Sequence, residues 1–298
     1  MGVLPGYPVY VISKGRWEPS SALTARFLID DGVDFRLVVE PPEVEKYAEQ
    51  FGLERLEVLP FADLGQGSIP ARNWVWEHAN SQGHERHWIL DDNIRGIYRR
   101  CKRIRVPCSA GPAMRATEDF VDRYENVAIA GLQYKMFVPD GLAAPPFTLN
   151  CHVYSCLLIS HEIPNAIRWR GRYNEDADLC LQVLAAGWCT VLLNAFLADK
   201  IRTMTMKGGN SDELYQDDGR LRMARELERA WPGVVKVGRR FGRPQHIVAD
   251  SWKRFDTPLR RRAGVDIESL PPNEYGMKLV KTKEITSREV QEFYDETR

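Results

Sequence analysis

The sequence predicts an α/β protein built on a mostly parallel sheet with helices on both faces. Two observations lead to this fold class. Short apolar, β-branched or aromatic runs alternate with helical patterns, and polar clusters follow the apolar runs. Strands are expected at 9–12, 35–39, 56–59 and 87–90, and helices at 21–31, from 42 through 51 and at 70–80. This alternation favours parallel pairing, because each helix returns the chain to the start of the next strand.

The second half of the chain has a less regular pattern. Helices are expected at 112–126, 176–186 and 214–231, and strands at 127–130, 153–159 and 188–193. The segment 137–148 is rich in Pro, Gly and Ala and is expected to be a loop. We therefore expect one domain over 1–210, with halves 1–100 and 101–210, followed by an irregular, basic α+β extension over 211–298.

Charge is balanced over the whole chain but not along it. The 41 basic and 41 acidic residues cancel, so the net charge does not indicate a partner. Six basic residues and no acidic one fall between 95 and 105, and nine basic residues stand against two acidic ones between 236 and 262. Such segments raise the local positive potential and could hold nucleic acid, although a solvated surface gives the same pattern.

The six cysteines do not form a zinc or disulfide pattern. None has C-x-x-C spacing, and their dilution through 298 residues favours reduced, mostly buried thiols. The start of the chain lacks a charged segment followed by an apolar core, and no apolar stretch is long enough to span a bilayer. We expect a cytoplasmic protein with no membrane contact.

Three polar segments are expected to meet at one edge of the sheet. The segments 13–16 and 91–93 directly follow predicted strands, and the loop 63–68 leads into the predicted helix at 70–80. Ligands of open α/β sheets bind beyond the carboxyl ends of the strands. The sequence therefore predicts a ligand site where these segments come together.

Asp91, Asp92 and Asn93 are the first candidates for chemistry. Adjacent carboxylates at the end of a buried strand repel one another, and burial increases the cost. A divalent cation would remove this penalty, since Mg²⁺ and Mn²⁺ prefer oxygen ligands of this kind. A turn or a helix cap explains the same residues equally well, because Asp and Asn favour both.

A second acidic cluster, formed by Glu175, Asp176 and Asp178, lies at the start of the predicted helix 176–186. Acidic side chains at a helix start are favoured by the helix dipole, so a structural role is open here too. Two such clusters could also divide the work, one holding a metal and the other supplying a general base. A base needs a carboxylate within hydrogen-bond reach of the proton that it removes.

Four segments together resemble the GT-A-fold glycosyltransferases. They are VYVISKGR (9–16), IPARN (69–73), ILDDNI (89–94) and YNEDADL (173–179), and the resemblance covers residues 7–210. Within that class the chain is similar to the TET/JBP-associated glycosyltransferases of phages, which attach sugars to hydroxymethylated pyrimidines in DNA. The resemblance implies a Rossmann-like domain, a UDP-sugar donor, Mn²⁺ or Mg²⁺ as cofactor, a DNA acceptor and a location in the host cytoplasm.

For the donor, the resemblance matches Asp91, Asp92 and Asn93 to the D-x-D element of these enzymes. Asp91 would contact the ribose or the metal, and Asn93 would stand where the usual metal-binding Asp falls, with Asp92 as a rival ligand. Further donor contacts would come from Ser13, Arg16, Arg72, Asn73 and Lys207, and a late metal ligand from His246.

For the acceptor, the resemblance matches Glu175 and Asp176 to the E-D element that supplies the base of inverting enzymes. Asp176 is the preferred base, and Glu175 would position the acceptor or act as the base instead. A target base would have to leave its stack, or be presented single-stranded, to reach the donor. Its DNA would be held by basic residues: Arg95, Arg99, Arg100, Arg103, Arg168, Arg170, Arg172, Arg239 and Arg240.

Other functions are compatible with the same residues. The acceptor could be a protein, a lipid or a glycan, and a nucleotidyltransferase also uses metal-binding carboxylates. A DNA-binding module without catalysis would explain the basic segments and treat both acidic clusters as caps. The sequence is equally compatible with hydroxymethylcytosine and hydroxymethyluracil as the target.

Overall fold

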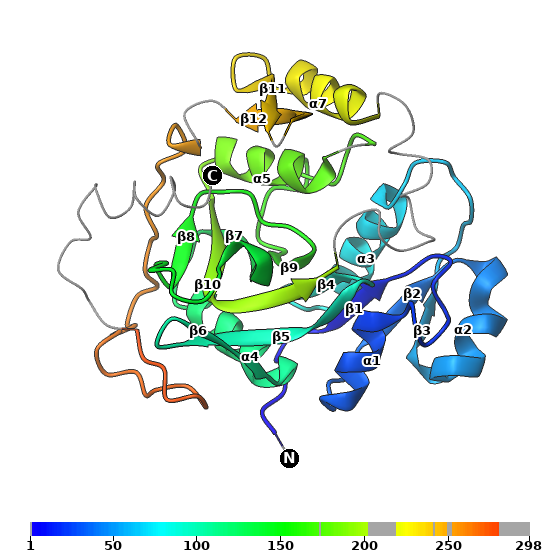
Figure 1. Cartoon of the computed structure of the whole chain (residues 1–298), viewed down its shortest axis with the longest axis horizontal. Helices are drawn as coiled ribbons and strands as arrows, with labels where there is room; N and C mark the ends of the chain where they lie inside the picture. Colours follow the sequence, from blue (N-terminus) through cyan, green and yellow to red (C-terminus); the bar gives the residue numbers. More distant parts are fainter. Residues whose placement is uncertain (1, 173, 202–218, 241, 249–251, 280–298) are drawn as a thin grey trace.

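The computed structural model describes residues 2–172, 174–201, 219–240, 242–248 and 252–279. Within them, a central sheet has the strand order β3-β2-β1-β4-β9-β7-β10-β5-β6, and β8 pairs with β10. Helices cover both faces of this sheet (Figure 1). The predicted fold class is confirmed.

The first half of the chain forms the elements that its hydrophobic pattern predicts. Its strands are β1 (Val9–Ile12), β2 (Arg36–Val39), β3 (Leu56–Val58) and β4 (Arg86–Asp91). Its helices are α1 (Leu23–Asp30), α2 (Val44–Phe51) and α3 (Ile69–Ser81), with 3-10 turns η1 (Pro41–Glu43) and η2 (Leu53–Arg55) on either side of α2. Strand β1 pairs in parallel with β2 and β4, and β2 pairs in parallel with β3. Both the elements and their parallel arrangement agree with the prediction.

The second half contains strands that the sequence pattern does not reveal. β5 (Ile94–Cys101) and β6 (Ile104–Cys108) form a hairpin, followed by α4 (Ala110–Val121), β7 (Val127–Tyr134) and the turn η3 (Lys135–Phe137). Then come β8 (Phe147–Leu149), β9 (Cys156–Ser160), α5 (Glu175–Ala185) and β10 (Cys189–Lys200). The hairpin lies in the basic segment 95–105, where charged residues interrupt the apolar pattern. It is held by pairing with β10, which is remote in the sequence.

Several element ends in this half differ from the prediction, and the two largest differences are those of α4 and β10. Helix α4 ends at Val121 rather than at residue 126, because the next residues bond to the C-terminal segment. The backbone N–H of Glu125 donates to the carbonyl of Arg260 at 2.8 Å, and the side chain of Asn126 donates to the carbonyl of Pro258 at 2.9 Å. Strand β10 continues to Lys200 rather than ending at 193, because β5 pairs with its second half.

The strand directions place several carboxyl ends at one edge of the sheet. β9 is antiparallel to both β4 and β7, and β7 is parallel to β10. Strands β1, β4, β7 and β10 therefore all point the same way. β5 is antiparallel to β10, so it starts at this edge and runs away from it. We call this the carboxyl edge.

The central strands of the sheet send alternate side chains into two separate cores. Val9 and Val11 of β1 lie in the core that also contains side chains of α1, α2 and α4, whereas Tyr10 lies in the core of α3 and α5. In β4, Trp88 lies in the first of these cores and Ile89 in the second. This period of two is the reason that unbroken apolar runs form these strands, since both faces are covered.

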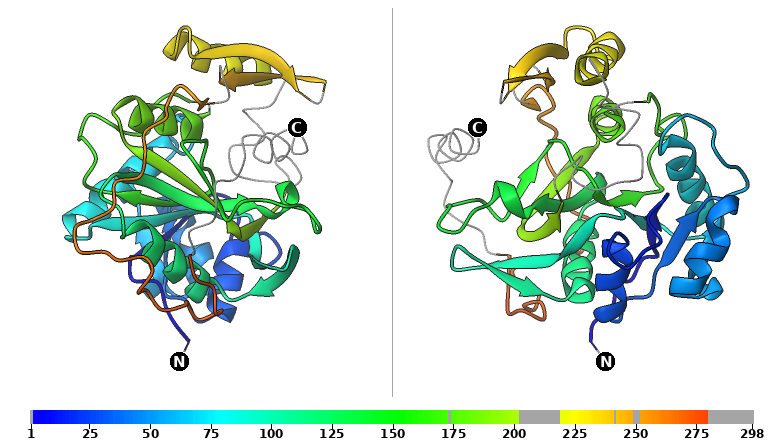
Figure 2. Two further views of the ribbon diagram at one scale, coloured as in Figure 1. Left: turned by 90° about the vertical axis from the view of Figure 1, so that its left-hand side faces the viewer. Right: turned by 45° about the vertical axis from the view of Figure 1, so that its right-hand side comes forward.

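The C-terminal extension packs on the main domain. Helix α7 (Gly219–Ala230) and the hairpin of β11 (Val235–Arg240) and β12 (Arg243–Val248) lie over α5 (Figures 1 and 2). Leu227 of α7 packs with Ala177 and Leu181 of α5. The segment 252–279 then returns along the body, where Leu259 and Tyr275 pack against the first core.

All six cysteines are free thiols, as the spacing predicts: Cys101, Cys108, Cys151, Cys156, Cys180 and Cys189. Cys156, Cys180 and Cys189 are buried, and the other three are partly exposed. Among the helices of the described segments, none has the length and apolar character required to cross a membrane.

Candidate functional site

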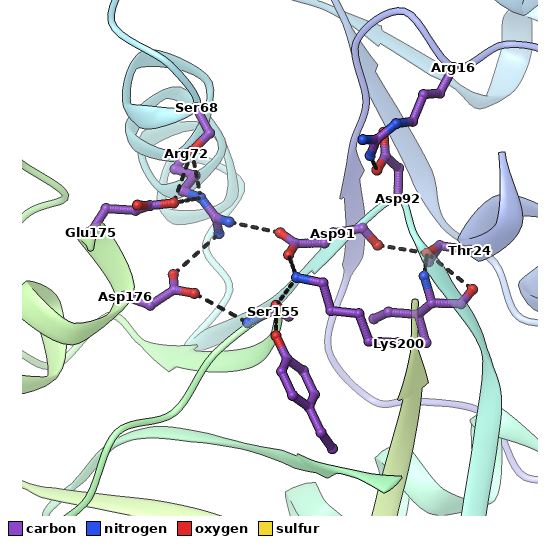
Figure 3. Close-up of polar contacts among 12 residues, drawn as sticks. Arg16, Thr24, Ser68, Arg72, Asp91, Asp92, Ser155, Glu175, Asp176 and Lys200 are labelled. Carbon is purple, nitrogen blue, oxygen red and sulfur yellow. Dashed lines mark hydrogen bonds and ion pairs between the residues drawn. The ribbon is translucent and has the colours of Figure 1, made fainter. Parts of the chain in front are cut away.

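Asp91 and Asp92 follow one another at the end of β4, but their carboxylates face different partners (Figure 3). The hydroxyl of Ser13, at the end of β1, donates to Oδ2 of Asp92 at 2.9 Å. Asp91 accepts instead from Arg72, whose Nε donates to Ser68 in the loop 63–68. The three polar segments expected to converge do meet at the carboxyl edge.

Asp91 lies between two cations, Arg72 and Lys200. Nη2 of Arg72 donates to Oδ1 at 2.8 Å, and Nζ of Lys200 donates to Oδ2 at 2.6 Å. Burial alone would raise the pKa of Asp91, but Lys200 and Arg72 outweigh burial and hold the pKa below its ordinary value. The carboxylate is therefore ionised at neutral pH, and its charge is compensated within the protein.

Asp92 belongs to a separate, buried polar network. Nη1 of Arg16 donates to its Oδ1, and the Ser13 hydroxyl bonds to both Asp92 and the hydroxyl of Tyr47. Burial raises the pKa of Asp92, and Arg16 and Ser13 oppose that rise. Ser13 and Arg16 are only 8% and 6% exposed, so their described contacts stabilise the end of β1. Nucleotide binding by these two side chains stays a prediction.

Arg72 connects the two acidic clusters. It is 3% exposed, and its guanidinium lies over the ring of Trp169, 4.6 Å from the centroid. Oε1 of Glu175 and Oδ1 of Asp176 each lie 3.9 Å from its nitrogens. Burial alone would lower the pKa of Arg72, but Asp176, Asp91 and Glu175 raise it, so the side chain keeps its charge. Clusters far apart in the sequence thus share one cation.

Asp176 is a mostly buried carboxylate whose hydrogen bonding is incomplete. The backbone N–H of Ser155 donates to Oδ2 at 3.4 Å, whereas the buried Oδ1 has no hydrogen-bond partner. Burial raises the pKa of Asp176 to about 7, with Arg72 opposing the rise and Glu175 adding to it. Glu175, in contrast, accepts a hydrogen bond from the hydroxyl of Ser68 at 3.3 Å. A carboxyl group that titrates near neutrality and keeps one oxygen unbonded is suited to accept a proton from a ligand.

Ser155 connects these groups, although the sequence gives it no special mark. Its carbonyl accepts the N–H of Asp91 at 2.8 Å, and its hydroxyl lies 2.6 Å from both Nζ of Lys200 and the hydroxyl of Tyr134. Its φ of 61° is in the left-handed region that non-glycine residues rarely adopt. Backbone outliers of this kind gather at functional sites. One residue thereby positions Asp91, Asp176 and Lys200 together.

Lys200 is the functional candidate that sequence analysis missed. It ends the long apolar strand β10, just as Asp91 ends β4. A charged side chain at the end of a buried strand is the same signal that identifies Asp91. The sequence pattern does not reveal this signal for Lys200, because it predicts the end of the strand at residue 193, well before Lys200.

A divalent cation fits this site only after a rearrangement. Both oxygens of Asp91 already accept hydrogen bonds from cationic groups, Arg72 and Lys200. Two unit positive charges about 4 Å apart near a protein surface repel each other by roughly 4 kcal/mol, so both groups would repel an added cation. No group of three or more His, Cys, Asp or Glu side chains converges within the described part of the chain. Oδ1 of Asn93, in contrast, is buried without a hydrogen-bond partner, as an oxygen awaiting a ligand would be. Metal binding by Asp91 and Asn93 stays a prediction.

The other predicted donor and metal residues have different surroundings. The amide of Asn73 donates to the carbonyl of Trp169 at 2.9 Å and accepts its N–H at 3.1 Å, so in this structure it fixes the backbone beneath Arg72. His246 lies on β12, where its ring is 6.3 Å from that of His152. Lys207 lies outside the described residues. Nucleotide binding by Asn73 and metal binding by His246 stay predictions.

Only the start of the basic segment 95–105 lies at the carboxyl edge. Arg95 lies at the start of β5, with its guanidinium 3.0 Å from Asp199. β5 then carries Arg99 and Arg100 away from the carboxyl edge, by up to roughly 25 Å over its 8 residues at the usual rise per strand residue, and Arg103 lies in the turn that follows. Arg100 donates to backbone carbonyls of the loop 142–144. An extended strand thus separates basic residues that are near in sequence, and contact of this segment with nucleic acid stays a prediction.

The second basic segment stays close to the proposed base. Arg170 makes two bonds to Asp178, at 2.9 and 3.2 Å, yet its side chain is 55% exposed. Arg168 pairs with Glu77 at 2.9 Å, and Arg172 is exposed. Arg239 and Arg240 lie on β11, above α5. Contact of these residues with nucleic acid stays a prediction.

The chain is similar to known glycosyltransferases. The family described as TET-associated glycosyltransferase matches residues 7–209, a range that contains Arg72, Asp91, Asp176 and Lys200. A crystal structure of a proposed nucleotide-diphospho-sugar transferase from Desulfovibrio desulfuricans G20 aligns with a TM-score of 0.37 and 13% identity, over 64% of this chain and 80% of that chain. No curated protein matches the sequence.

Proposed function

The chain belongs to the TET-associated glycosyltransferase family, and from that membership we propose that it transfers a sugar from a UDP-sugar to the hydroxyl of a hydroxymethylated pyrimidine in DNA. Glycosyl transfer from a nucleotide-sugar donor follows from the family. The uridine nucleotide, the DNA acceptor and the stereochemistry are our proposal. The main support for the proposal is a pair of carboxyl groups at the carboxyl edge. The charge of Asp91 is compensated by neighbouring cations, and the pKa of Asp176 is raised to about 7.

In this proposal Asp176 is the general base. The acceptor oxygen attacks the anomeric carbon of the sugar while the bond from that carbon to the diphosphate breaks. The acceptor proton passes to Asp176, and UDP departs with the electrons of the broken bond. A single displacement of this kind inverts the anomeric configuration and needs no covalent intermediate. A base with a pKa of about 7 is well matched to this task at neutral pH.

The surroundings of Asp176 favour a nucleobase as the acceptor. A row of partly buried aromatic rings begins beside Ser155: Tyr134 and Tyr154 have centroids 4.3 Å apart, and His152 lies 5.0 Å from Tyr154. Trp252 stacks on His152 at 6.2 Å. Enzymes that act on an extruded or single-stranded base hold it against aromatic side chains. The exposed side chain of Arg170 is available to face phosphates.

Mn²⁺ or Mg²⁺ enters this proposal as a partner of the donor. A diphosphate adds negative charge to a cluster whose carboxylates already outnumber its cations, so a further cation would lower the repulsion. Asp91 and Asn93 would hold it, since Oδ1 of Asn93 lacks a hydrogen-bond partner. When bound there, the ion would help to neutralise the departing diphosphate.

The decisive experiment incubates the purified protein with a panel of UDP-sugars and DNA that contains hydroxymethylcytosine or hydroxymethyluracil. We expect the modified DNA to gain the mass of one sugar for each reacted base, with Mn²⁺ or Mg²⁺ and not with EDTA. Unmodified DNA of the same sequence is the matched control and should gain nothing. No mass gain with any donor, together with UDP release in the presence of a glycan or peptide, would reassign the acceptor.

A further inference from the structure

Lys200 is the least expected cation of the site. Its side chain is 11% exposed, and Nζ lies 2.6 Å from both Oδ2 of Asp91 and Oγ of Ser155. The ring of Tyr134 is also close, with its centroid 5.5 Å from Nζ. Neither the resemblance nor the family match gives this residue a role. It reaches the carboxyl edge at the end of β10, beside the strand end that bears Asp91 (Figure 3).

Neutralising Asp91 does not by itself require Lys200. Arg72 already donates to the other oxygen of that carboxylate, and one cation is enough to compensate one carboxylate. Placing a long ammonium side chain out of water costs desolvation and rotamer freedom. Lys200 is thus a second cation on this carboxylate, at the edge where ligands of open α/β sheets bind.

The two cations differ in their freedom to move. Arg72 is held by the hydroxyl of Ser68, by the face of Trp169 and by two further carboxylates at 3.9 Å. A planar guanidinium with so many partners has one favourable orientation. Lys200 has a flexible four-carbon stem and a compact ammonium whose donors rotate. Its ammonium contacts one carboxylate, that of Asp91, and the hydroxyl groups of Ser155 and Tyr134.

We propose that Lys200 binds the diphosphate of the donor, and that it exchanges Asp91 for a phosphate oxygen when the donor enters. The inference rests on the proposed function, since it takes a nucleotide diphosphate as the ligand. The exchange keeps the ammonium paired in both states, because one negative group replaces another. It also frees Oδ2 of Asp91, which can then accept a divalent cation. Lys200 thereby couples arrival of the diphosphate to availability of the metal ligand.

The test measures binding of UDP and of uridine by calorimetry, with Mn²⁺ at one fixed concentration. The variant Lys200→Met keeps the length of the stem and removes the charge. We expect it to bind UDP at least tenfold more weakly and uridine as tightly as the wild type, because only UDP carries the diphosphate. Lys200→Arg, which restores the charge, should recover part of the lost UDP affinity.

Lys135→Met is the matched control. Nζ of Lys135 pairs with Asp199 at 3.2 Å and lies 3.6 Å from the centroid of the Tyr98 ring, so it too has a carboxylate and a tyrosine as neighbours. Because it does not contact Asp91, its loss should leave UDP affinity unchanged. Thermal unfolding of each variant shows that the comparison is made on folded protein.

The possible results separate this inference from the proposed function. If the wild type binds UDP and Lys200→Met binds it equally well, Lys200 does not hold the diphosphate, while the donor assignment stands. If Lys200→Met weakens UDP and uridine by the same factor, its role is structural and the inference is wrong. A wild-type protein that binds neither molecule contradicts the proposed donor and this inference with it.

Discussion

Glu118 and Asp176 are both carboxylates withdrawn from water, and their surroundings differ in one respect. Glu118 on α4 is 1% exposed and accepts three hydrogen bonds, from the backbone of Gly6 at 2.7 Å, the backbone of Tyr7 at 3.3 Å and the indole of Trp88 at 2.8 Å. Asp176 on α5 accepts a single long one from Ser155, and its Oδ1 has none. Burial raises the pKa of both groups.

The difference distinguishes a structural carboxylate from a functional candidate. Buried polar groups in folded proteins almost always have hydrogen-bond partners, so an exception calls for an explanation. Glu118 has its bonds within the protein and ties the N-terminal segment to β4 and α4. Asp176 keeps an oxygen without a partner beside a buried arginine, which is the arrangement expected when the missing partner is a substrate.

Replacing Asp176 by Asn should give the largest effect. The amide cannot accept the acceptor proton, so we expect kcat to fall by about 10²–10⁴-fold, the usual contribution of a general base. Sugar transfer to hydroxymethylated DNA, measured by mass spectrometry at saturating donor, checks this. Glu175→Gln is the comparison variant. If it loses activity while Asp176→Asn stays active, the two acidic residues exchange roles.

The pH dependence of activity should follow Asp176. The base acts in its ionised form, and burial raises its pKa to about 7. The value of kcat/KM should therefore fall tenfold for each pH unit below about 7 and become constant above it. A profile recorded on the wild type and on Glu118→Gln should show the same inflection in both. An inflection near the ordinary aspartate value would mean that another group limits the reaction.

Glu118→Gln should lower stability and leave catalysis alone. In the variant, an amide nitrogen stands where a carboxylate oxygen of the wild type accepts from N–H donors. A buried donor left without an acceptor lowers the free energy of unfolding by about 1–3 kcal/mol. Urea unfolding at pH 7 should show that loss, while kcat at a temperature where the variant is folded stays within about twofold of wild type. A large loss of kcat in folded protein would remove the contrast with Asp176.

Ser155→Ala should have a smaller effect, mainly on the donor. Alanine accepts the unusual φ of 61° about as well as serine does, so the change isolates the hydroxyl bonded to Lys200 and Tyr134. Loss of one hydrogen bond of about 1 kcal/mol corresponds to roughly a fivefold rise in KM for the UDP-sugar. Steady-state kinetics would show it, and an unchanged KM would mean that Ser155 acts only through its backbone.

A further effect concerns the pH dependence of stability. The pKa of Asp176 is higher in the folded protein than the ordinary 3.8, so the folded state binds this proton more tightly. Protonation of Asp176 therefore stabilises the folded state fully below about pH 3.8, and this stabilisation is lost as the pH rises through about 7. Asp176→Asn has no such group and should become more stable than wild type as the pH increases. Urea unfolding across this range would detect the divergence.

The accuracy of the sequence predictions differs between the two halves of the chain. The strands and helices before Asp91 are predicted almost to the residue, because strands covered on both faces read as unbroken apolar runs and their helices have regular spacing. The acidic groups at Asp91, Glu175 and Asp176 follow from the same pattern, as charges at the ends of buried elements. The hairpin of β5 and β6 does not, because its charged side chains mask a strand held by β10.

The sequence by itself determined the fold class, the edge at which ligands bind and the two acidic clusters, since each is written in local periodicity and in polar residues next to apolar runs. Only the tertiary structure decided which groups meet there. In the folded chain, Arg72 contacts both acidic clusters, and Lys200 and Ser155 bond to Asp91. Most of the basic segment 95–105 lies away from the site. The reason is physical. Pairing between strands remote in sequence sets these contacts, and no local pattern encodes a partner that lies a hundred residues away.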